Sequence, residues 1–181
     1  MNFNAHNTDM ARARESRVAR FVIKNLIQQE SISTILDYGC GYGKDVEAYS
    51  NAGLLAKGYD PYFRSGDPTG AFDMVTMAYV LNVIPAHFQR VLALQDAFYR
   101  VVSGGLLVVA TRTDTLIEGL AGKRKWSMFD DGYITSPERK TFQKGFNSNE
   151  LKDIMINHLN LIDIKTVINT SDALCVVARK A

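Results

Sequence analysis

Residues 35–43 read Ile-Leu-Asp-Tyr-Gly-Cys-Gly-Tyr-Gly and carry most of the structural information in the chain. Residues 34–37, which include the start of this stretch, predict a buried parallel strand. Glycine then stands at three alternate positions, where a missing Cβ lets the main chain approach a ligand closely. Residues 44–51 predict a helix whose first turn points amide N–H groups and a positive dipole end at that ligand. The spacing differs from the Gly-x-Gly-x-x-Gly of dinucleotide sites.

Length and composition indicate an ordinary globular protein. The chain has 181 residues, 46% hydrophobic and 22% charged, which predicts a single domain over residues 1–181 with a full core. No apolar run reaches the roughly 18 residues of a membrane helix, and the polar N-terminus carries no secretory signal. We therefore expect a cytoplasmic protein without a membrane partner, with Cys40 and Cys175 reduced. The histidines are scattered, so we expect no metal site. The net charge of +2 does not by itself indicate nucleic-acid binding.

The N-terminal residues predict a long helix, from about residue 8 to residue 29. Apolar residues recur at helical spacing from Val18 to Leu26 and would face the core. Basic residues, among them Arg14 and Arg17, recur on another face. That face is either a solvated surface or an anion-binding face, and in the second case Arg14 and Arg17 would contact the substrate.

Strands and helices alternate along the rest of the chain. Predicted strands cover residues 34–37, 55–59, 72–79, 106–110, 161–168 and 173–178. Predicted helices cover residues 44–51, 86–102 and 148–158. Residues 103–105 (Ser-Gly-Gly) would end the second of these helices in a left-handed cap, and residues 111–146 form an irregular, variable substrate segment. The pattern predicts an α/β, Rossmann-like three-layer sandwich, whose mostly parallel sheet has an antiparallel C-terminal strand.

The spacing Asp-x-Gly-x-Gly-x-Gly after a strand resembles motif I of the class I S-adenosylmethionine (SAM) methyltransferases. Three further segments read Gly-Tyr-Asp-Pro-Tyr-Phe-Arg (58–64), Ala-Tyr-Val-Leu-Asn-Val-Ile (78–84) and Asp-Gly-Tyr-Ile-Thr (131–135). With Thr-Phe-Gln-Lys at 141–144, they resemble the methyltransferase family found with DNA phosphorothioation systems, over nearly the whole chain. The resemblance implies an enzyme that uses SAM and releases S-adenosylhomocysteine (SAH), and it implies no particular acceptor.

The chain departs from these family patterns in two places. Only eleven residues separate Asp60 from Phe72, too few for the usual helix and third strand. We therefore expect the third strand to be missing and a loop to close the adenine side. Amino-directed DNA methyltransferases carry Asp/Asn-Pro-Pro-aromatic after the fourth strand, whereas residues 82–85 read Asn-Val-Ile-Pro. The missing Pro-Pro weakens the argument for methylation of a base amino group.

Asp60 is the leading candidate for a cofactor ligand. It lies 23 residues after Asp37, at the predicted end of the second strand, where a carboxylate can accept from both ribose hydroxyls. The alternative is an acid that opens an Asp-Pro turn. Asp37 would orient the glycine loop or contact the methionine ammonium; Tyr62 and Asp67 would contact the adenine, unless Asp67 is only a loop acid. The predicted cofactor residues are Asp37, Tyr38, Gly39, Cys40, Gly41, Gly43, Asp60, Pro61, Tyr62, Asp67 and Tyr79.

The candidate catalytic residues are Asn82 and Tyr79. Asn82 is the one strongly polar side chain in the apolar segment 79–85, so it either contacts a substrate amine or is a turn asparagine. Tyr79 either lines the pocket or belongs to the core. Tyr133 and Lys144 are candidates for substrate contact, and a packing or surface role is the alternative for Lys144.

Four functions are compatible with these residues. The first is methylation of a nucleic acid or a modified nucleotide, with the arginine face and Lys123–Trp126 holding phosphates and stacking on a base. The second is methylation of a small molecule, which a closed apolar pocket roofed by residues 112–146 would favour. The third is a non-catalytic SAM-binding subunit, because no catalytic acid or base is identifiable. A nicotinamide-dependent oxidoreductase is a distant fourth.

Overall fold

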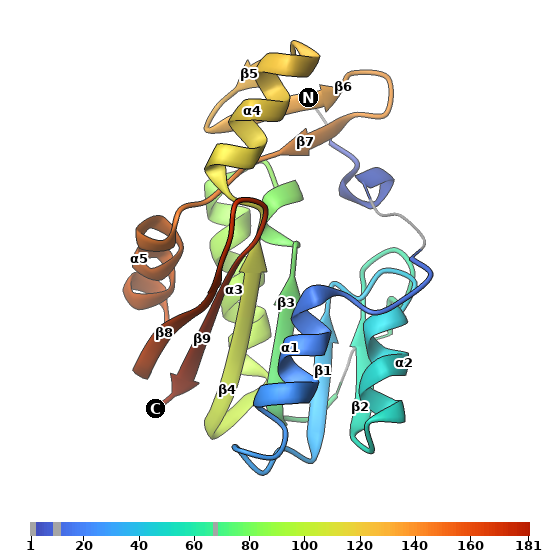
Figure 1. Cartoon of the computed structure of the whole chain (residues 1–181), viewed down its shortest axis with the longest axis vertical. Helices are drawn as coiled ribbons and strands as arrows, with labels where there is room; N and C mark the ends of the chain where they lie inside the picture. The colour runs from blue at the N-terminus through green and yellow to red at the C-terminus, as the bar shows by residue number, and fades with distance from the viewer. Residues whose placement is uncertain (1–2, 9–11, 67–68) are drawn as a thin grey trace.

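A mostly parallel sheet forms the centre of the computed structural model, which describes residues 3–8, 12–66 and 69–181 (Figure 1). Its strands are β1 (Thr34–Tyr38), β2 (Leu55–Tyr59), β3 (Phe72–Ala78), β4 (Val101–Thr111), β8 (Leu161–Asn169) and β9 (Leu174–Lys180). They lie in the order β2-β1-β3-β4-β9-β8. The first four strands in this order are parallel, and β9 pairs antiparallel with β4 and with β8. The predicted sheet with an antiparallel C-terminal strand is confirmed.

Helices cover both faces of this sheet (Figure 1). They are α1 (Arg17–Asn25), α2 (Lys44–Asn51), α3 (His87–Tyr99) and α5 (Ser148–His158). Val22 of α1 and Tyr49 of α2 belong to one buried apolar cluster, together with residues of the strands. Leu94 of α3 and Leu151 of α5 belong to a second cluster on the opposite face. Two cores therefore separate three layers, as the alternation of strands and helices predicts.

The large sheet ends at β2. Among the described residues, no strand pairs with the outer edge of β2, so the prediction that the third strand is missing is confirmed. Asp60 to Arg64 form a tight turn after β2, in which the two residues exchange main-chain hydrogen bonds of 3.0 and 3.2 Å. This turn stands where the usual helix and third strand would begin, and it places Asp60 at the end of β2.

The N-terminal helix is much shorter than predicted. α1 begins at Arg17 rather than near residue 8, and it ends at Asn25 rather than near residue 29. Ser16 caps it, because its hydroxyl accepts from the amide of Ala19 at 3.0 Å. The amide of Ser16 donates to the Asp45 carboxylate at 2.7 Å, which turns the chain away from the helix axis. This contact with α2 overrides the local helical pattern, and residues 5–8 form a separate 3-10 helix, η1 (Ala5–Thr8).

Residues 103–105 lie in β4 and not in a helix cap, so that prediction is wrong. α3 ends at Tyr99, and β4 begins two residues later. The register between β3 and β4 moves at this point, so residues 103–105 form a bulge. A Cβ on Gly105 would lie 2.7 Å from the carbonyl oxygen of Asp73, which explains the glycine at that position.

Residues 111–146 are more regular than predicted. After a short loop they form α4 (Asp114–Arg124), then β5 (Ser127–Phe129), β6 (Gly132–Ser136) and β7 (Thr141–Gln143). These three strands form a second, antiparallel sheet beyond the carboxyl ends of β3 and β4 (Figure 1). The prediction failed because α4 contains two glycines and no clear apolar stripe, while two of the strands are only three residues long.

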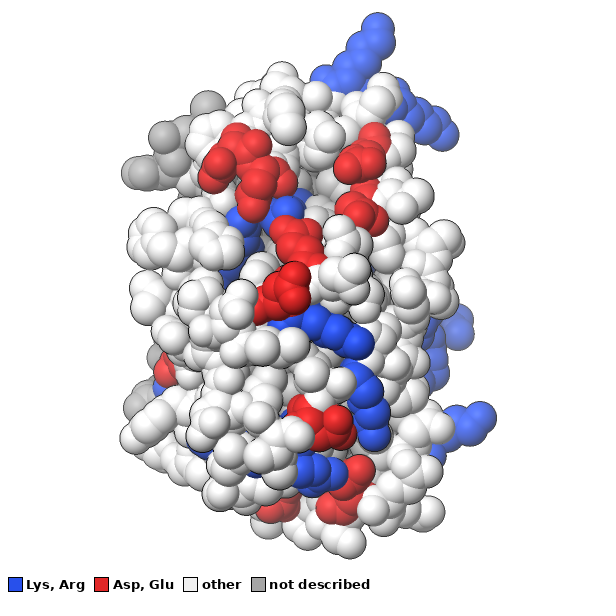
Figure 2. All heavy atoms as spheres, turned by 90° about the vertical axis from the view of Figure 1, so that its left-hand side faces the viewer, with Lys and Arg blue, Asp and Glu red and all other residues white. Residues whose placement is uncertain are grey.

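The described surface carries charges of both signs. On the face that includes α5 and β8, acidic and basic side chains alternate down the middle of the molecule (Figure 2). Within the part of the chain that the structure describes, no helix has the length and apolar character needed to cross a membrane.

Candidate active site

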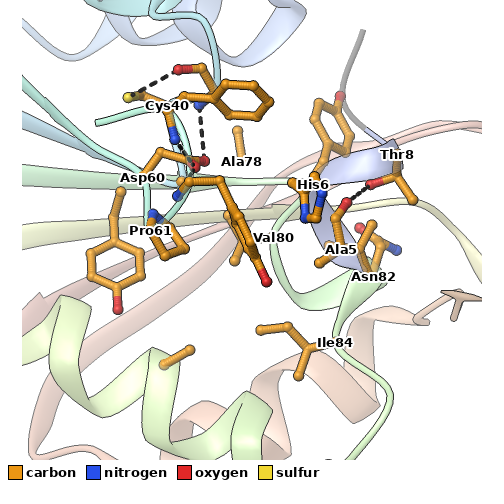
Figure 3. Close-up of a pocket in the computed structure, with 18 of the residues that line it drawn as sticks. Ala5, His6, Thr8, Cys40, Asp60, Pro61, Ala78, Val80, Asn82 and Ile84 are labelled. Carbon is orange, nitrogen blue, oxygen red and sulfur yellow. Dashed lines mark hydrogen bonds between the residues drawn. The ribbon is translucent and has the colours of Figure 1, made fainter. Parts of the chain in front are cut away.

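A cavity of about 410 Å³ lies at the carboxyl ends of β1, β2 and β3 (Figure 3). Most of its wall comes from four segments: η1, the glycine loop after β1, the turn after β2 and the loop after β3. Among the predicted cofactor residues, those on its wall are Tyr38, Gly39, Cys40, Gly41, Asp60, Pro61, Tyr62 and Tyr79. Asp37 and Gly43 lie outside the wall, and Asp67 lies outside the described residues. The cavity is where the strand–loop–helix unit predicts a ligand.

The glycine loop is preformed by hydrogen bonds within the protein. The amides of Gly39 and Cys40 donate to the carbonyl of Tyr59, at 2.7 and 3.0 Å, and the amide of Gly41 donates to Asp60. Gly39, Gly41 and Gly43 have φ angles of +81°, +52° and +83°, which favour glycine. A Cβ on Gly39 would lie 2.2 Å from a methyl carbon of Val80. The missing Cβ at Gly39 therefore allows close packing against the loop after β3, and Gly39 and Gly41 present main chain to the cavity.

Asp60 connects the glycine loop with the turn after β2. Its Oδ1 accepts from the amides of Tyr62 and Phe63, at 2.9 and 3.1 Å, and its Oδ2 accepts from the amide of Gly41 at 3.2 Å. A carboxylate has about four acceptor sites, so roughly one is left for a ligand on the cavity side. The geometry thus leaves room for one strong hydrogen bond from a ribose rather than two independent ones.

Asp37 lies beneath the glycine loop and is buried. The Thr76 hydroxyl lies 2.9 Å from its Oδ1. Burial, followed by the nearby Asp45 carboxylate, raises the pKa of Asp37 from its ordinary 3.8 to about 7. Arg12 lies on the cavity wall and pairs with Asp45 at 3.2 Å, which brings a guanidinium to this side of the site. The sequence placed Arg12 on the basic face with Arg14 and Arg17 and not at the cofactor site, because nothing local indicates its contact with α2.

Tyr79 and Asn82 lie on the wall of the cavity, at and after the end of β3. Tyr79 has a φ of +63°, a strained conformation for a side chain of this size, and its amide donates to Ala110 at 2.7 Å. The Asn82 amide group donates to the carbonyl of Lys144 at 2.5 Å, and its Oδ1 accepts from the amide of Arg112 at 3.0 Å. Asn82 is 1% exposed. Through these bonds Asn82 fixes the main chain at Lys144 and at Arg112.

Aromatic rings form the wall near Asp60. The Tyr38 hydroxyl donates to Asp96 of α3 at 2.8 Å, so its ring is fixed against that helix. Burial and the adjacent Asp96 raise the pKa of Tyr38 above 10. The ring centroids of Tyr62 and His6 are 4.0 Å apart. The ring of Tyr59 lies 5.1 Å from that of Tyr38. Both pairs are tilted rather than parallel, and aromatic rings on a cavity wall can cover a flat base.

The N-terminal segment, residues 3–8, covers the cavity. Ala5, His6 and Thr8 are on its wall (Figure 3). The segment is held by the small sheet, because the amide of Asn4 donates to the carbonyl of Lys140 at 2.8 Å. The Phe3 ring also contacts the rings of Phe129 and Phe142. No sequence signal pointed to this segment, since its contacts reach across more than 120 residues.

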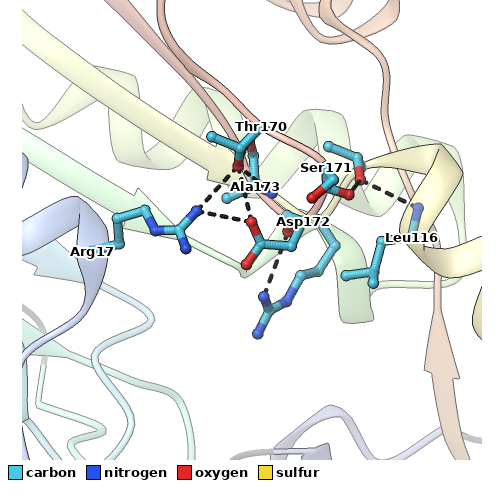
Figure 4. Close-up of polar contacts among 8 residues, drawn as sticks. Arg17, Leu116, Thr170, Ser171, Asp172 and Ala173 are labelled. Carbon is cyan, nitrogen blue, oxygen red and sulfur yellow. Dashed lines mark hydrogen bonds and ion pairs between the residues drawn. The ribbon is translucent and has the colours of Figure 1, made fainter.

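The four predicted substrate residues do not line the cavity. Arg17 donates to Asp172 at 2.8 Å and to Thr170 at 3.1 Å, on the outside of the molecule (Figure 4). Lys144 is buried and pairs with Glu150 at 2.8 Å, which agrees with the packing alternative. Arg14 and Tyr133 also lie outside the wall. Residues that do reach it from the later part of the chain are Arg112 and Gln143.

Comparisons with known proteins agree with this geometry. The model of a family described as a methyltransferase domain matches residues 10–161. A SAM-dependent methyltransferase from Clostridium acetobutylicum ATCC 824 has a similar structure, with a TM-score of 0.62, 11% identity and 90% coverage of each chain. An O-methyltransferase family protein from Burkholderia thailandensis gives a TM-score of 0.61 and 12% identity, and the match covers 88% of this chain and 54% of that one.

A third similar structure contains both cofactor product and acceptor. It is the 1,6-didemethyltoxoflavin-N1-methyltransferase of Burkholderia thailandensis, with 1,6-didemethyltoxoflavin and SAH bound. The TM-score is 0.62 at 14% identity, and the match covers 92% of this chain and 79% of that one. A search of curated proteins finds no match. Among the described residues, no group of three or more His, Cys, Asp or Glu side chains is placed to hold a metal ion.

Proposed function

Because the chain belongs to the methyltransferase domain family, we propose that it transfers the methyl group of SAM to a small-molecule acceptor. The observation that carries this proposal is the cavity at the strand ends, which the N-terminal segment covers. Its volume of about 410 Å³ lies within the range of small-molecule sites. The N-terminal segment narrows the access of a long polymer to the strand ends, because Ala5, His6 and Thr8 form part of the cavity wall.

The residues on the wall fit such a cofactor. Gly39 lets the glycine loop pack closely against Val80 on the cavity wall, and Asp60 keeps roughly one acceptor site for a ribose hydroxyl. Arg12 brings a positive charge to the side of the glycine loop, where it can attract the cofactor's carboxylate. When bound, SAM supplies a methyl group on positively charged sulfur, and the C–S bond breaks as an acceptor lone pair takes the methyl. The chain's own part is to align the two reactants and exclude water.

Methylation of nucleic acid is a second candidate. The resemblance to the phosphorothioation-associated family supports it, as does the exposed Lys123–Lys125 run, where the Arg124 guanidinium lies 5.7 Å from the Trp126 ring centroid. Against it, three of the four arginines expected to bind phosphates, all except Arg14, have acidic partners. These pairs are Arg12–Asp45, Arg17–Asp172 and Arg20–Glu15. Their positive charge is partly compensated within the protein.

Transfer of tritiated methyl from SAM into fractions of a cell extract tests the proposal. Small-molecule, DNA and tRNA fractions are incubated separately with the protein, and the Asp60→Asn variant serves as the matched control. We expect label in the small-molecule fraction with the wild-type protein and far less with the variant. Label in DNA or tRNA alone would establish the second candidate. SAH binding without transfer to any fraction would indicate a non-catalytic subunit, and tight NAD binding without SAH binding would indicate an oxidoreductase.

A further inference from the structure

Arg112 places a positive charge on the cavity wall at the end of β4. It directly follows Thr111, the last residue of that strand. Its main chain is fixed, because the Asn82 side chain accepts from its amide at 3.0 Å and its carbonyl accepts from the amide of Phe146 at 2.9 Å. The side chain therefore starts from a rigid point, as a residue that recognises a ligand must.

The positive charge of the Arg112 guanidinium is only weakly compensated by neighbouring groups of the described chain. The guanidinium lies 4.6 Å from the Tyr79 ring centroid, and its one hydrogen bond within the described part of the chain is a long contact of 3.5 Å to the carbonyl of Asp172. No carboxylate of the described residues lies within 4.0 Å of it, whereas Arg12 and Arg17 each have an aspartate partner. A partly buried guanidinium in a cavity favours an anionic ligand, and its planar fork matches a carboxylate.

Two anionic groups could meet this charge: the carboxylate of SAM and a carboxylate of the acceptor. Arg12 is linked to Asp45 of α2, so it lies on the glycine-loop side of the cavity. Arg112 lies on the side of β3 and β4, beside Tyr79 and Asn82. The two guanidinium groups thus serve different halves of the cavity. Arg12, which shares its charge with Asp45, is placed on the cofactor side, and Arg112, which has no such partner among the described residues, is placed to meet the second ligand.

We propose that the methyl acceptor carries a carboxylate and that Arg112 binds it. This inference rests on the proposed methyl transfer to a small molecule and specifies the class of that molecule. The carboxylate is held by charge-assisted hydrogen bonds and anchors the acceptor at the end of β4. The anchored molecule then extends toward the part of the cavity next to the glycine loop, where the methyl group is supplied.

Matched pairs of acids and amides test this proposal, because the members of each pair differ mainly in charge. The probes are benzoate and benzamide, phenylacetate and phenylacetamide, and indole-3-acetate and indole-3-acetamide, titrated calorimetrically into SAH-saturated protein. At least one acid is expected to bind about tenfold more tightly than its amide. Arg112→Gln should remove that preference and leave the SAH dissociation constant within about threefold. Arg20→Gln, at an arginine outside the cavity, should change neither quantity.

Arg112→Lys provides a second variant that keeps the charge and loses the planar fork, and we expect it to retain part of the preference. Three results would overturn the proposal: no acid preference in any pair, a preference that survives in Arg112→Gln, or a loss of SAH affinity above tenfold in that variant. The last result would assign Arg112 to the cofactor carboxylate. Failure of the wild-type protein to bind SAH would instead refute the proposed function itself.

Discussion

Replacement of Asn82 by leucine separates two roles for this residue. Leucine has a similar size but no polar atoms, so the variant leaves the carbonyl of Lys144 and the amide of Arg112 without the partners that Asn82 provides. A buried polar group without a partner costs about 1–3 kcal/mol. Two such groups lower the free energy of unfolding by about 3 kcal/mol. At about 2–4 °C per kcal/mol for a chain of this size, the melting temperature should fall by about 6–12 °C.

Thermal and urea unfolding of the Asn82→Leu variant measure this loss, and SAH binding and the initial rate of methyl transfer are measured in parallel. Asn160→Leu is the matched control, because Asn160 is exposed and its replacement should change the free energy of unfolding by less than about 0.5 kcal/mol. If Asn82 instead acts directly on the substrate, the leucine variant will keep its stability and lose turnover. A variant within 1 kcal/mol of the wild type would therefore refute the positioning role argued from its hydrogen bonds.

Two further substitutions test the cofactor side of the cavity. Asp60→Asn removes the negative charge and one acceptor oxygen, so SAH affinity measured by calorimetry should fall at least about tenfold, while Glu118→Gln on exposed α4 should have no effect. An unchanged dissociation constant in Asp60→Asn would contradict the ribose contact. The pKa of Asp37 is raised from 3.8 to about 7 in the folded protein. Between these two values the folded state keeps a proton that the unfolded state has released. The free energy of unfolding should therefore decrease as the pH rises from about 4 to about 7. Asp37→Asn should flatten that part of the profile in urea unfolding between pH 4 and 8, and an unaltered slope would show that another group is responsible.

The elements nearest the glycine loop could be predicted from sequence because their signals are local. The helix at residues 44–51 and the strand at 55–59 have the predicted bounds, since glycine, apolar runs and an Asp-Pro turn delimit them. The errors occur where a distant residue decides the local structure. Asp45 binds the amide of Ser16, so the N-terminal helix begins later than predicted, and the close approach of Asp73 places Gly105 in a strand bulge. Neither contact leaves a periodic pattern.

The two halves of the cavity also differ in how far local sequence signals predict them. The cofactor half comes largely from residues 38–63, a compact stretch in which the loop and the acidic residue are recognisable by spacing. The half that we propose for the acceptor combines the loop after β3, Arg112 and Gln143, which are far apart in the chain. No spacing rule connects them, so the sequence could indicate a methyl donor and leave its acceptor open.

One cluster of side chains holds the acceptor half together. Asn82 binds the main chain at Arg112 and Lys144, and so joins the loop after β3 to the ends of β4 and β7. Arg90 of α3 is fully buried and donates to the carbonyls of Ile84 and Pro85, at 2.9 Å each, and it also contacts Asp131 of the small sheet. The loop after β3 is thus held at Asn82 and again at Ile84 and Pro85. A buried guanidinium that satisfies two carbonyls costs less than an unpaired one, and it stabilises one geometry of the loop. The positions of Arg112 and Gln143 relative to the cofactor therefore depend on polar residues that need not touch either substrate.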